Sequence, residues 1–275
     1  DALNDIRNLK VAIDAALKCP EKPHVQGCLV YTISPVHTNE SFVELAVELE
    51  KMGCHSVCIK DMSGLLKPYV AEDLVKKLKA AVKIPIDLHT HCTSGFGHAT
   101  YLKAIEAGVD IIDTALAPFS SDTSQPCTET MVAMLEGEDR DTGLDRQAMT
   151  PISKYFLGVK QDLIKTFNLK GYFDVNPNVL DFQIPGGMLS NLANQLKEAG
   201  MEDKYQDLLD EMPRVRKDVG YPPLVTPSSQ IVGTMATFNV MSGERYKMVP
   251  NEFKDLARGK FGRTPVEVDR KFLTD

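Results

Sequence analysis

The first 116 residues alternate between two patterns of apolar side chains. Four segments place apolar residues at helical spacing, over residues 5–18, 42–52, 68–82 and 99–107. Each is followed by a short run that is apolar along most of its length, over residues 24–33, 56–62, 84–89 and 109–116. Such runs are typical of strands that are buried on both faces of a sheet. Their alternation with helices predicts βαβ units and a parallel sheet.

The pattern changes after about residue 126, where helical spacing dominates. We expect helices over residues 129–135, 150–167, 188–199 and 205–219, separated by Gly- and Pro-containing stretches at 184–188 and 221–227. No strand rhythm is visible in this part. We therefore predict two regions, an α/β region over residues 1–125 and a mainly helical region over residues 126–275.

Four βα units are compatible with two architectures. They can form an open doubly wound sheet, or they can be half of a (β/α)8 barrel. A half-barrel leaves two unpaired sheet edges and an unfilled interior. The chain begins inside a unit, and no strand pattern precedes its first helical segment. The pattern alone leaves open whether the sheet is doubly wound or whether the first four units of a barrel are missing.

The charge and hydropathy of the chain exclude several classes of partner. The net charge is −7 and the pI is about 5.5, so we expect no nucleic-acid partner, because phosphate binding needs a concentrated basic surface. No apolar run reaches the roughly 18–20 residues of a membrane span, and the first residues lack a signal-peptide pattern. We therefore expect a cytoplasmic protein.

The six cysteines form neither a dense disulfide pattern nor a CxxC motif. Cys54 and Cys58 lie four residues apart with His55 between them, a combination that metal sites also use. This segment enters an apolar strand, however, where buried free thiols are common. We favour core thiols over metal ligands here.

Polar residues follow three predicted strands where each strand ends: Lys60 and Asp61, then His89 and His91, then Asp113. In a barrel these ends lie on the catalytic face. His89 and His91 are alternate residues of one strand, so both imidazoles project to the same side and suit a divalent transition metal. A desolvated lysine needs a partner. Lys60 either pairs with one of the two aspartates or reacts with CO2 to form a carbamate, an oxygen ligand for a metal; Asp61 can equally cap the following turn.

Two further polar stretches have simpler interpretations. Residues 93–98 (TSGFGH) match neither phosphate-binding fingerprint, and we interpret them as a turn that lets the backbone approach the site. Thr226, Ser228 and Ser229 follow a proline-rich stretch, and their composition indicates the start of a helix.

Several stretches occur in the same order in one known family: DALNDIRN, YTISPVHT, IKDMSGLLKPY, DLHTHCTSG, YLKAIEAGVDIIDTA, PFSSDTSQP, QIPGGMLSNL, GYPPLVTPSSQIVG and GERYKM. Through them the chain resembles, along essentially its whole length, the carboxyltransferase domain of biotin-dependent enzymes. That family includes the oxaloacetate decarboxylase alpha subunit, pyruvate carboxylase and its separate B subunit, and the transcarboxylase subunit that acts on pyruvate.

The resemblance implies a fold and a set of site residues. The implied fold is the C-terminal half of a TIM (β/α)8 barrel, with about four parallel strands, followed by a mainly helical funnel at the barrel mouth. Lys60 matches the carboxylated lysine that binds the metal, and His89 and His91 match the two histidine ligands. Thr226 matches the threonine that passes a proton between biotin and the enolate of pyruvate. Ser229 lies where the family contacts the biotin ring.

The implied activity is carboxyl transfer between biotin and pyruvate or oxaloacetate, through a metal-stabilised enolate. The implied cofactors are a divalent metal (Zn, Mn or Co) and biotin carried on a separate domain or subunit. The implied partners are a biotinyl carrier domain, further copies of this chain in a homo-oligomer, and a membrane subunit. This chain itself is not expected to insert into a membrane. The family's four preceding strands, with its aspartate ligand and its pyruvate-binding residues, are not in this sequence. We therefore expect the chain alone to be inactive.

Two alternatives stay open. The first is a metal-dependent lyase or Claisen-condensing enzyme on the same barrel, which shares the HxH pair but lacks the lysine ligand. The second is a catalytically incomplete half-barrel that needs a partner in order to fold or act.

Overall fold

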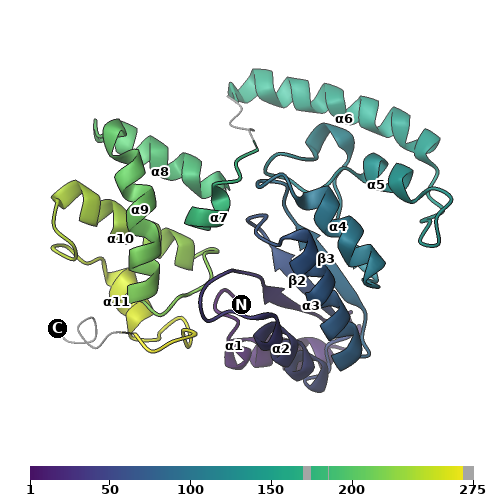
Figure 1. The fold of residues 1–275 in the computed structure, drawn as a ribbon, viewed down its shortest axis with the longest axis horizontal. Coiled ribbons are helices and arrows are strands. Elements are labelled where there is room, and N and C mark those ends of the chain that lie inside the picture. The colour runs from purple at the N-terminus through teal and green to yellow at the C-terminus, as the bar shows by residue number, and fades with distance from the viewer. Residues whose placement is uncertain (170–174, 185, 269–275) are drawn as a thin grey trace.

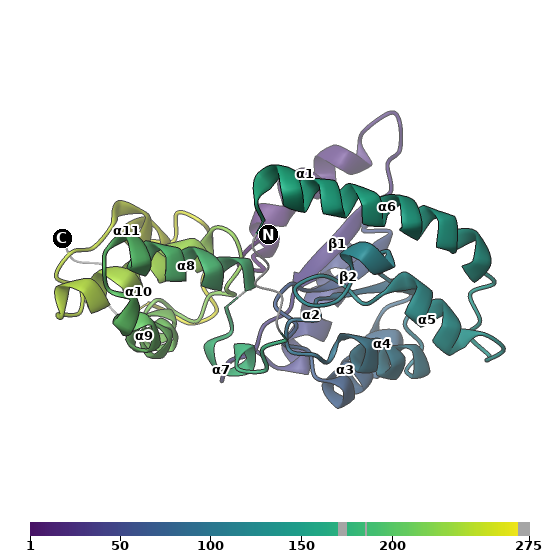
Figure 2. The same ribbon diagram turned by 90° about the horizontal axis from the view of Figure 1, so that it is seen from above.

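The structure is a computed structural model that describes residues 1–169, 175–184 and 186–268. Both views show an α/β region beside a separate group of helices, α8 to α11 (Figures 1 and 2). The two parts have their own apolar cores, one built around the sheet and one between these helices.

Four parallel strands form the sheet, in the sequential order β1-β2-β3-β4. The strands are β1 (Gln26–Val30), β2 (Ser56–Asp61), β3 (Ile86–Thr90) and β4 (Ile111–Ile112). The helices of this region are α1 (Ile6–Leu17), α2 (Asn39–Lys51), α3 (Pro68–Ala81) and α4 (Gly97–Glu106). Consecutive helices pack against one another, as α3 does against both α2 and α4. A doubly wound sheet reverses its strand order and carries helices on both faces, whereas barrel units keep sequential order with one helix layer. The predicted half-barrel with four parallel strands is confirmed.

The fourth strand is much shorter than predicted. The sequence pattern indicates a strand over residues 109–116, but only Ile111–Ile112 pair with β3 as a strand. Beyond Asp113 the chain turns towards a later segment, and Ala115 N donates to Pro126 O at 3.0 Å. In the described residues no strand pairs with the outer side of β4. The hydrogen bonds between β3 and β4 therefore end where the residues after Asp113 bond to this later loop instead.

The segment before α1 covers part of the edge of β1. The side chain of Asn4 accepts a hydrogen bond from Val30 N (2.8 Å) and donates to Val30 O (2.9 Å). Asp5 then caps α1 by accepting from Arg7 N at 3.0 Å. A side-chain amide therefore satisfies both backbone groups at one residue of the edge strand, which lowers the cost of leaving that edge without a neighbouring strand.

The two faces of the sheet differ in chemistry. The face towards the helices is apolar and fully buried, and it carries Leu29, Val57, Ile59, Ile86 and Leu88. The alternate residues form the opposite face, where paired positions point to the same side: Cys28 with Cys58, Cys58 with Asp87, and Lys60 with His89. The expectation that the strands are buried on both faces holds only in part for this second face, where Cys58 and Asp87 are buried but Cys28, Lys60 and His89 are half-buried. One helix layer needs only one apolar face, and the other face is free to carry polar groups.

Helices dominate after residue 126. They are α5 (Thr128–Leu135), α6 (Arg146–Phe167), α7 (Val179–Phe182), α8 (Gly186–Glu198), α9 (Tyr205–Asp218), α10 (Ser228–Ser242) and α11 (Asn251–Ala257). A short 3-10 turn at Glu202–Lys204 precedes α9, and another at Ala117–Phe119 lies before this region. None of the described helices combines the length and apolar character of a membrane span. The four helices predicted here are present as α5, α6, α8 and α9. The spacing of apolar residues missed α7, α10 and α11, although the composition of residues 226–229 indicated where α10 starts.

The missed helix α10 lies at the centre of the second core. Most of its residues are buried, and they include the polar Ser229, Thr237 and Asn239 as well as Ile231 and Val232. The apolar Met241, by contrast, is 43% exposed. Because polar side chains are buried and an apolar one is exposed, the sequence shows no amphipathic periodicity. That is why the segment after VTPSSQ does not indicate a helix by spacing.

Arg216 of α9 joins the helical part to the loop after β1. It is 3% exposed, and it donates to Ile33 O (2.8 Å), Thr32 Oγ1 (3.0 Å) and Pro222 O (2.8 Å), and also to the side chain of Gln183. Among the described residues, none of its partners is a carboxylate. A buried cation is thus held entirely by neutral acceptors from three segments.

Candidate metal site

Lys60, His89 and His91 meet at the carboxyl ends of β2 and β3. Lys60 Nζ lies 3.3 Å from His89 Nε2, and the Nε2 atoms of the two histidines lie 3.2 Å apart. Lys60 and His89 are neighbours in the β2–β3 register, and His91 follows two residues later on the same side. The structure thus brings together the three residues for which the sequence predicted metal binding.

The outer nitrogen of each imidazole is fixed by an acceptor. His89 Nδ1 lies 2.8 Å from Asp113 Oδ2, and His91 Nδ1 lies 2.5 Å from Thr123 O. A carboxylate and a carbonyl can only accept, so both Nδ1 atoms carry the hydrogen and both Nε2 atoms present a lone pair in the neutral rings. Burial lowers the pKa of His91, which keeps that ring neutral. Two lone pairs therefore face the same small space.

Lys60 does not form the ion pair that was its simplest alternative role. Among the described residues its ammonium group contacts His89, while Asp113 binds His89 instead of the lysine. Asp61 is fully buried and accepts from Leu65 N (2.9 Å), Leu66 N (2.8 Å) and the Thr90 hydroxyl (2.7 Å). Its predicted role as the cap of the following turn is confirmed.

Gln125 is a site residue that the sequence pattern did not single out. Its Nε2 lies 3.2 Å from His89 Nε2 and 3.1 Å from His91 Nε2. It comes from the loop after β4, which also supplies Thr123. The available signal was that this loop follows the fourth strand end and is rich in polar residues, as PFSSDTSQP shows. Neither periodicity nor strand alternation applies to a loop, so the sequence could not select one residue within it.

The donor set fits a divalent transition metal. Two neutral imidazole nitrogens converge, and each ring is oriented through its second nitrogen, as in many metal sites. The described residues contain no group of three or more His, Cys, Asp or Glu side chains that could hold a metal. Lys60, after conversion to an oxygen donor, is a candidate for a third ligand from this part of the chain.

The cysteines lie outside this donor set. All six are free thiols, and Cys54 and Cys58 are buried. Cys54 belongs to the apolar core around the sheet, as the preference for core thiols predicts, whereas Cys58 lies on the second face of the sheet. Cys28 and Cys58 pair across β1 and β2, two residues before Lys60 on the same face, and their thiols share a hydrogen bond.

Thr226 and Ser229 lie apart from the histidine cluster. Thr226 is exposed beside a cavity of about 240 Å³ that is also lined by Leu3 and Phe261, and Ser229 is 3% exposed in the first turn of α10. Within the described part of the chain, no hydrogen bond joins either residue to the histidines. The expected helix start is present, but the residue before α10 is Pro227 and no side chain caps it. The Ser228 hydroxyl donates back to Val225 O at 2.8 Å.

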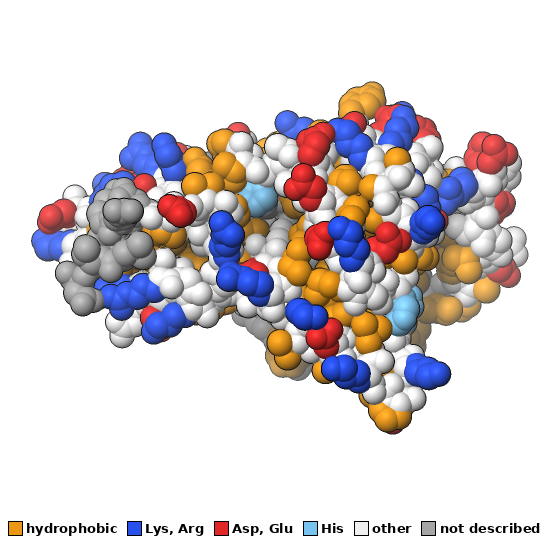
Figure 3. All heavy atoms as spheres, turned by 90° about the horizontal axis from the view of Figure 1, so that it is seen from below, with side chains coloured by type: hydrophobic (Ala, Val, Ile, Leu, Met, Phe, Trp, Pro, Cys, Tyr) orange, Lys and Arg blue, Asp and Glu red, His pale blue; other side chains and the backbone are white. Residues whose placement is uncertain are grey.

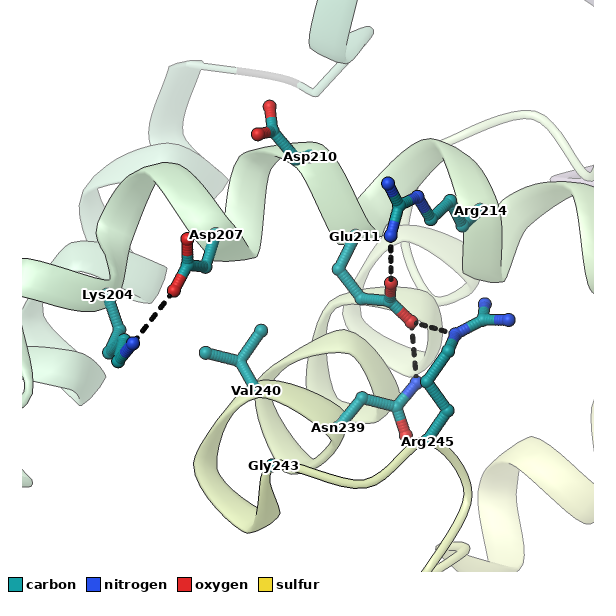
Figure 4. A pocket seen from close by; sticks show the side chains of 9 residues that line it. All are labelled: Lys204, Asp207, Asp210, Glu211, Arg214, Asn239, Val240, Gly243 and Arg245. Carbon is teal, nitrogen blue, oxygen red and sulfur yellow. Dashed lines mark hydrogen bonds and ion pairs between the residues drawn. The ribbon is translucent and has the colours of Figure 1, made fainter.

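A second pocket, of about 360 Å³, lies between α9 and the end of α10 (Figure 4). Glu211 accepts from Arg245 Nε (2.6 Å) and Asn239 Nδ2 (2.8 Å), and Lys204 pairs with Asp207 at 3.1 Å. Three cationic and three acidic residues line it, so their charges balance. We assign no ligand to this pocket.

Basic and acidic side chains are interspersed over the face of the molecule drawn in Figure 3.

Two family models match successive parts of the chain. A model described as HMGL-like matches residues 26–155, and a model described as a conserved carboxylase domain matches residues 179–275. The first match covers β1 to β4 and the candidate metal site, and the second covers α7 to α11.

Curated relatives show the same likeness along the chain. The B subunit of pyruvate carboxylase from Methanocaldococcus jannaschii is 52% identical over 273 residues, which are 99% of this chain and 48% of the relative. The methylmalonyl-CoA carboxyltransferase 5S subunit of Propionibacterium freudenreichii subsp. shermanii is 46% identical over 275 residues, 99% of this chain and 53% of the relative. The chain thus spans about half the length of the curated relatives that it matches.

Solved structures agree with the curated relatives. The carboxyl transferase domain of Rhizobium etli pyruvate carboxylase, solved with 3-hydroxypyruvate, matches with a TM-score of 0.91 and 34% identity, over 99% of this chain and 48% of that one. The same domain with pyruvate and biocytin matches with a TM-score of 0.88 and 35% identity, over 96% and 46% of the two chains. Sequence, fold and family models therefore agree, and the chain belongs to the family of carboxyltransferase domains found in pyruvate carboxylase and transcarboxylase.

Proposed function

We propose that this chain supplies part of a biotin-dependent carboxyltransferase that moves a carboxyl group between biotin and pyruvate or oxaloacetate. The observation that carries the proposal is the convergence of Lys60, His89 and His91 at the carboxyl ends of adjacent parallel strands. In barrel enzymes this end of the strands carries the active site. The similarity to the separate B subunit of an archaeal pyruvate carboxylase supports the same reaction class.

In this proposal the histidines and the lysine hold a divalent metal, with zinc, manganese or cobalt as candidates. His89 and His91 would bind through Nε2, and Lys60 would bind as a carbamate after its amine takes up CO2 and releases a proton. When bound, such a metal polarises the keto oxygen of the substrate and stabilises negative charge on it. The chain's own contribution is to orient both rings, through Asp113 and Thr123, so that their lone pairs converge.

Thr226 and Ser229 are proposed to act on the biotin side of the reaction. The hydroxyl of Thr226 would carry a proton between the methyl carbon of pyruvate and the ureido nitrogen of biotin. A threonine hydroxyl is a weak base, so this requires a concerted transfer in a fixed geometry rather than a shifted pKa. Ser229 contributes only if the biotin ring inserts beside the first turn of α10, because its side chain is 3% exposed.

The partners follow from the same proposal. Biotin would arrive on a carrier domain or subunit, in agreement with biocytin in the Rhizobium etli domain. A homo-oligomer, a membrane-subunit partner and a cytoplasmic location belong to the proposal as well. We also propose that the chain alone does not catalyse the reaction, because the described residues supply only part of a metal ligand set.

The first test is the metal content of the purified chain after incubation with zinc. We expect metal to bind near-stoichiometrically to the wild-type chain and to be absent from the His89→Ala/His91→Ala double variant. Bicarbonate should strengthen binding to the wild type and leave Lys60→Met unchanged, because only the lysine can form a carbamate. Equal metal content in wild type and double variant would refute the site.

The reaction is tested in the protein that contains this chain, with a carboxylated biotin carrier and pyruvate. Thr226→Ala should lower turnover by orders of magnitude; a change of only a few-fold would remove Thr226 from the proton transfer. Turnover of an acyl-CoA without biotin would favour the lyase or Claisen alternative. If co-expression of this chain with a complementary half-barrel gives a stable complex without turnover, the chain has a structural role.

A further inference from the structure

The Gln125 amide is held against the two histidines by its own loop. Its Oε1 accepts from the Ser124 hydroxyl at 3.1 Å, and its backbone carbonyl accepts from Ser121 N at 2.7 Å. The amide nitrogen then lies 3.2 and 3.1 Å from the Nε2 atoms of His89 and His91. One NH2 group thus spans the space between both ring nitrogens.

The hydrogen-bond network decides which end of the amide faces the rings. Both Nε2 atoms carry lone pairs, because Asp113 and Thr123 fix the hydrogens on the opposite nitrogens. An amide oxygen in that position would face two acceptors, whereas the NH2 group offers one hydrogen to each. Ser124 can at the same time donate to the amide oxygen. With the nitrogen towards the histidines each ring nitrogen has a donor, and at His89 the Lys60 ammonium (3.3 Å) shares the single lone pair with the amide.

We propose that Gln125 competes with a metal ion for the Nε2 atoms of His89 and His91. This inference rests on the proposed function, because it takes His89 and His91 as the metal ligands. A cation needs the same two lone pairs that the amide hydrogens occupy, and the amide presents the positive end of its dipole to the cation. Binding therefore requires the amide to withdraw, which breaks both hydrogen bonds to the rings. If it turns to present its oxygen, it must also give up the bond from Ser124.

The competition is measured as zinc affinity of the full chain, by titration against a chromophoric zinc chelator. Gln125→Met keeps the length of the side chain and removes both hydrogens, so we expect about tenfold tighter binding, as the loss of two hydrogen bonds to neutral acceptors implies. Gln125→Glu replaces the donor by an acceptor of the same shape, and we expect about a hundredfold tighter binding because a carboxylate adds a third ligand. Ser124→Ala frees the amide to turn and should tighten binding by a few-fold.

The matched control is Gln147→Met on the exposed side of α6, which should bind zinc like the wild type. Weaker binding by Gln125→Met would overturn the proposal, because it would make Gln125 a ligand rather than a competitor. Unchanged affinity in Gln125→Met and Ser124→Ala would overturn it as well, while the metal site itself would stand. If neither the wild type nor any of these variants binds zinc, the proposed metal site fails together with the competition. A thermal melt of each variant shows that it is folded, and Ser124→Ala tests the idea without changing Gln125.

Discussion

Arg216→Met should separate the helical part of the chain from the half-barrel. The guanidinium donates four hydrogen bonds, to Thr32, Ile33, Gln183 and Pro222, which lie in the loop after β1, at the end of α7 and before α10. Methionine fills a similar volume but donates nothing. The substitution therefore leaves these acceptors without their common donor while the packing of α9 stays nearly the same.

The expected loss of stability is the difference between two opposing effects. An unsatisfied buried acceptor costs about 1–3 kcal/mol. Because two of the four acceptors are only partly buried, we take about 1–2 kcal/mol for each, or roughly 4–8 kcal/mol together. Against this, methionine removes a cation that is costly to bury. Burial lowers the pKa of Arg216 from 12.5 to about 10, which corresponds to roughly 3 kcal/mol at 1.36 kcal/mol per pKa unit. We therefore expect a net destabilisation of about 1–5 kcal/mol, which agrees in size with the loss of one partner of a buried polar pair.

The assay is guanidinium denaturation of the chain, followed by circular dichroism and by intrinsic tyrosine fluorescence. We expect Arg216→Met to lower the midpoint and to separate the unfolding of the helical part from that of the half-barrel. Arg214→Met on the same helix is the control, because the Arg214 side chain is 69% exposed and should contribute less than about 0.5 kcal/mol. If Arg216→Met unfolds like this control, in one transition, the buried arginine does not hold the two parts together.

Three further predictions concern titratable groups near the strand ends. The hydrogen bond from Cys58 lowers the pKa of Cys28 to about 7, so iodoacetamide should alkylate Cys28 increasingly as the pH rises through 7. Cys58→Ala should suppress this alkylation. Equal alkylation of Cys28 in the wild type and in Cys58→Ala would contradict the pairing. Burial, aided by the charge of Arg216, lowers the pKa of His37 to about 4. Between pH 6.5 and 4 the unfolded chain therefore binds more protons than the folded chain. The free energy of unfolding should fall as the pH drops through that range, by up to roughly 3 kcal/mol. His37→Phe should reduce this dependence of stability on pH. An NMR titration of His37 with a midpoint near 6.5 would refute the lowered pKa. Asp113→Ala should weaken metal binding roughly 10–100-fold by releasing the ring of His89, whereas equal affinity would show that the aspartate does not orient it.

Periodicity in the sequence was sufficient to predict the half-barrel. Three of the four predicted strands and all four helices of the α/β region are present within a few residues of their expected ends. Buried strands and amphipathic helices leave repeating patterns because each must turn an apolar side to the same core. The fourth strand was overestimated, because its apolar residues are used partly in the loop that pairs with residues 126–128 rather than in the sheet.

The site could be predicted only where strand geometry applies. His89 and His91 share a face because they alternate in β3, and Lys60 lies beside them because β2 and β3 are parallel neighbours. Gln125 lies in a loop, where no spacing rule says which side chain turns back towards the strands. Thr226 and Ser229 came from the family resemblance, and their roles stay predictions.

The sequence by itself determined the order of the βα units and the three residues that converge at the strand ends. Local pattern suffices for these features, because alternation along a strand and apolar spacing along a helix are properties of neighbouring residues. The division into two regions at residue 125 stays a prediction, and the apolar core around the sheet also includes Met131, Leu135 and Val179. The tertiary structure decided which face of the sheet is polar, that α10 lies at the centre of the second core, and that Asp113, Thr123 and Gln125 complete the surroundings of the histidines. The hydrogen bonds of Arg216 likewise join residues up to 184 positions apart, and no local pattern in the sequence can reveal them.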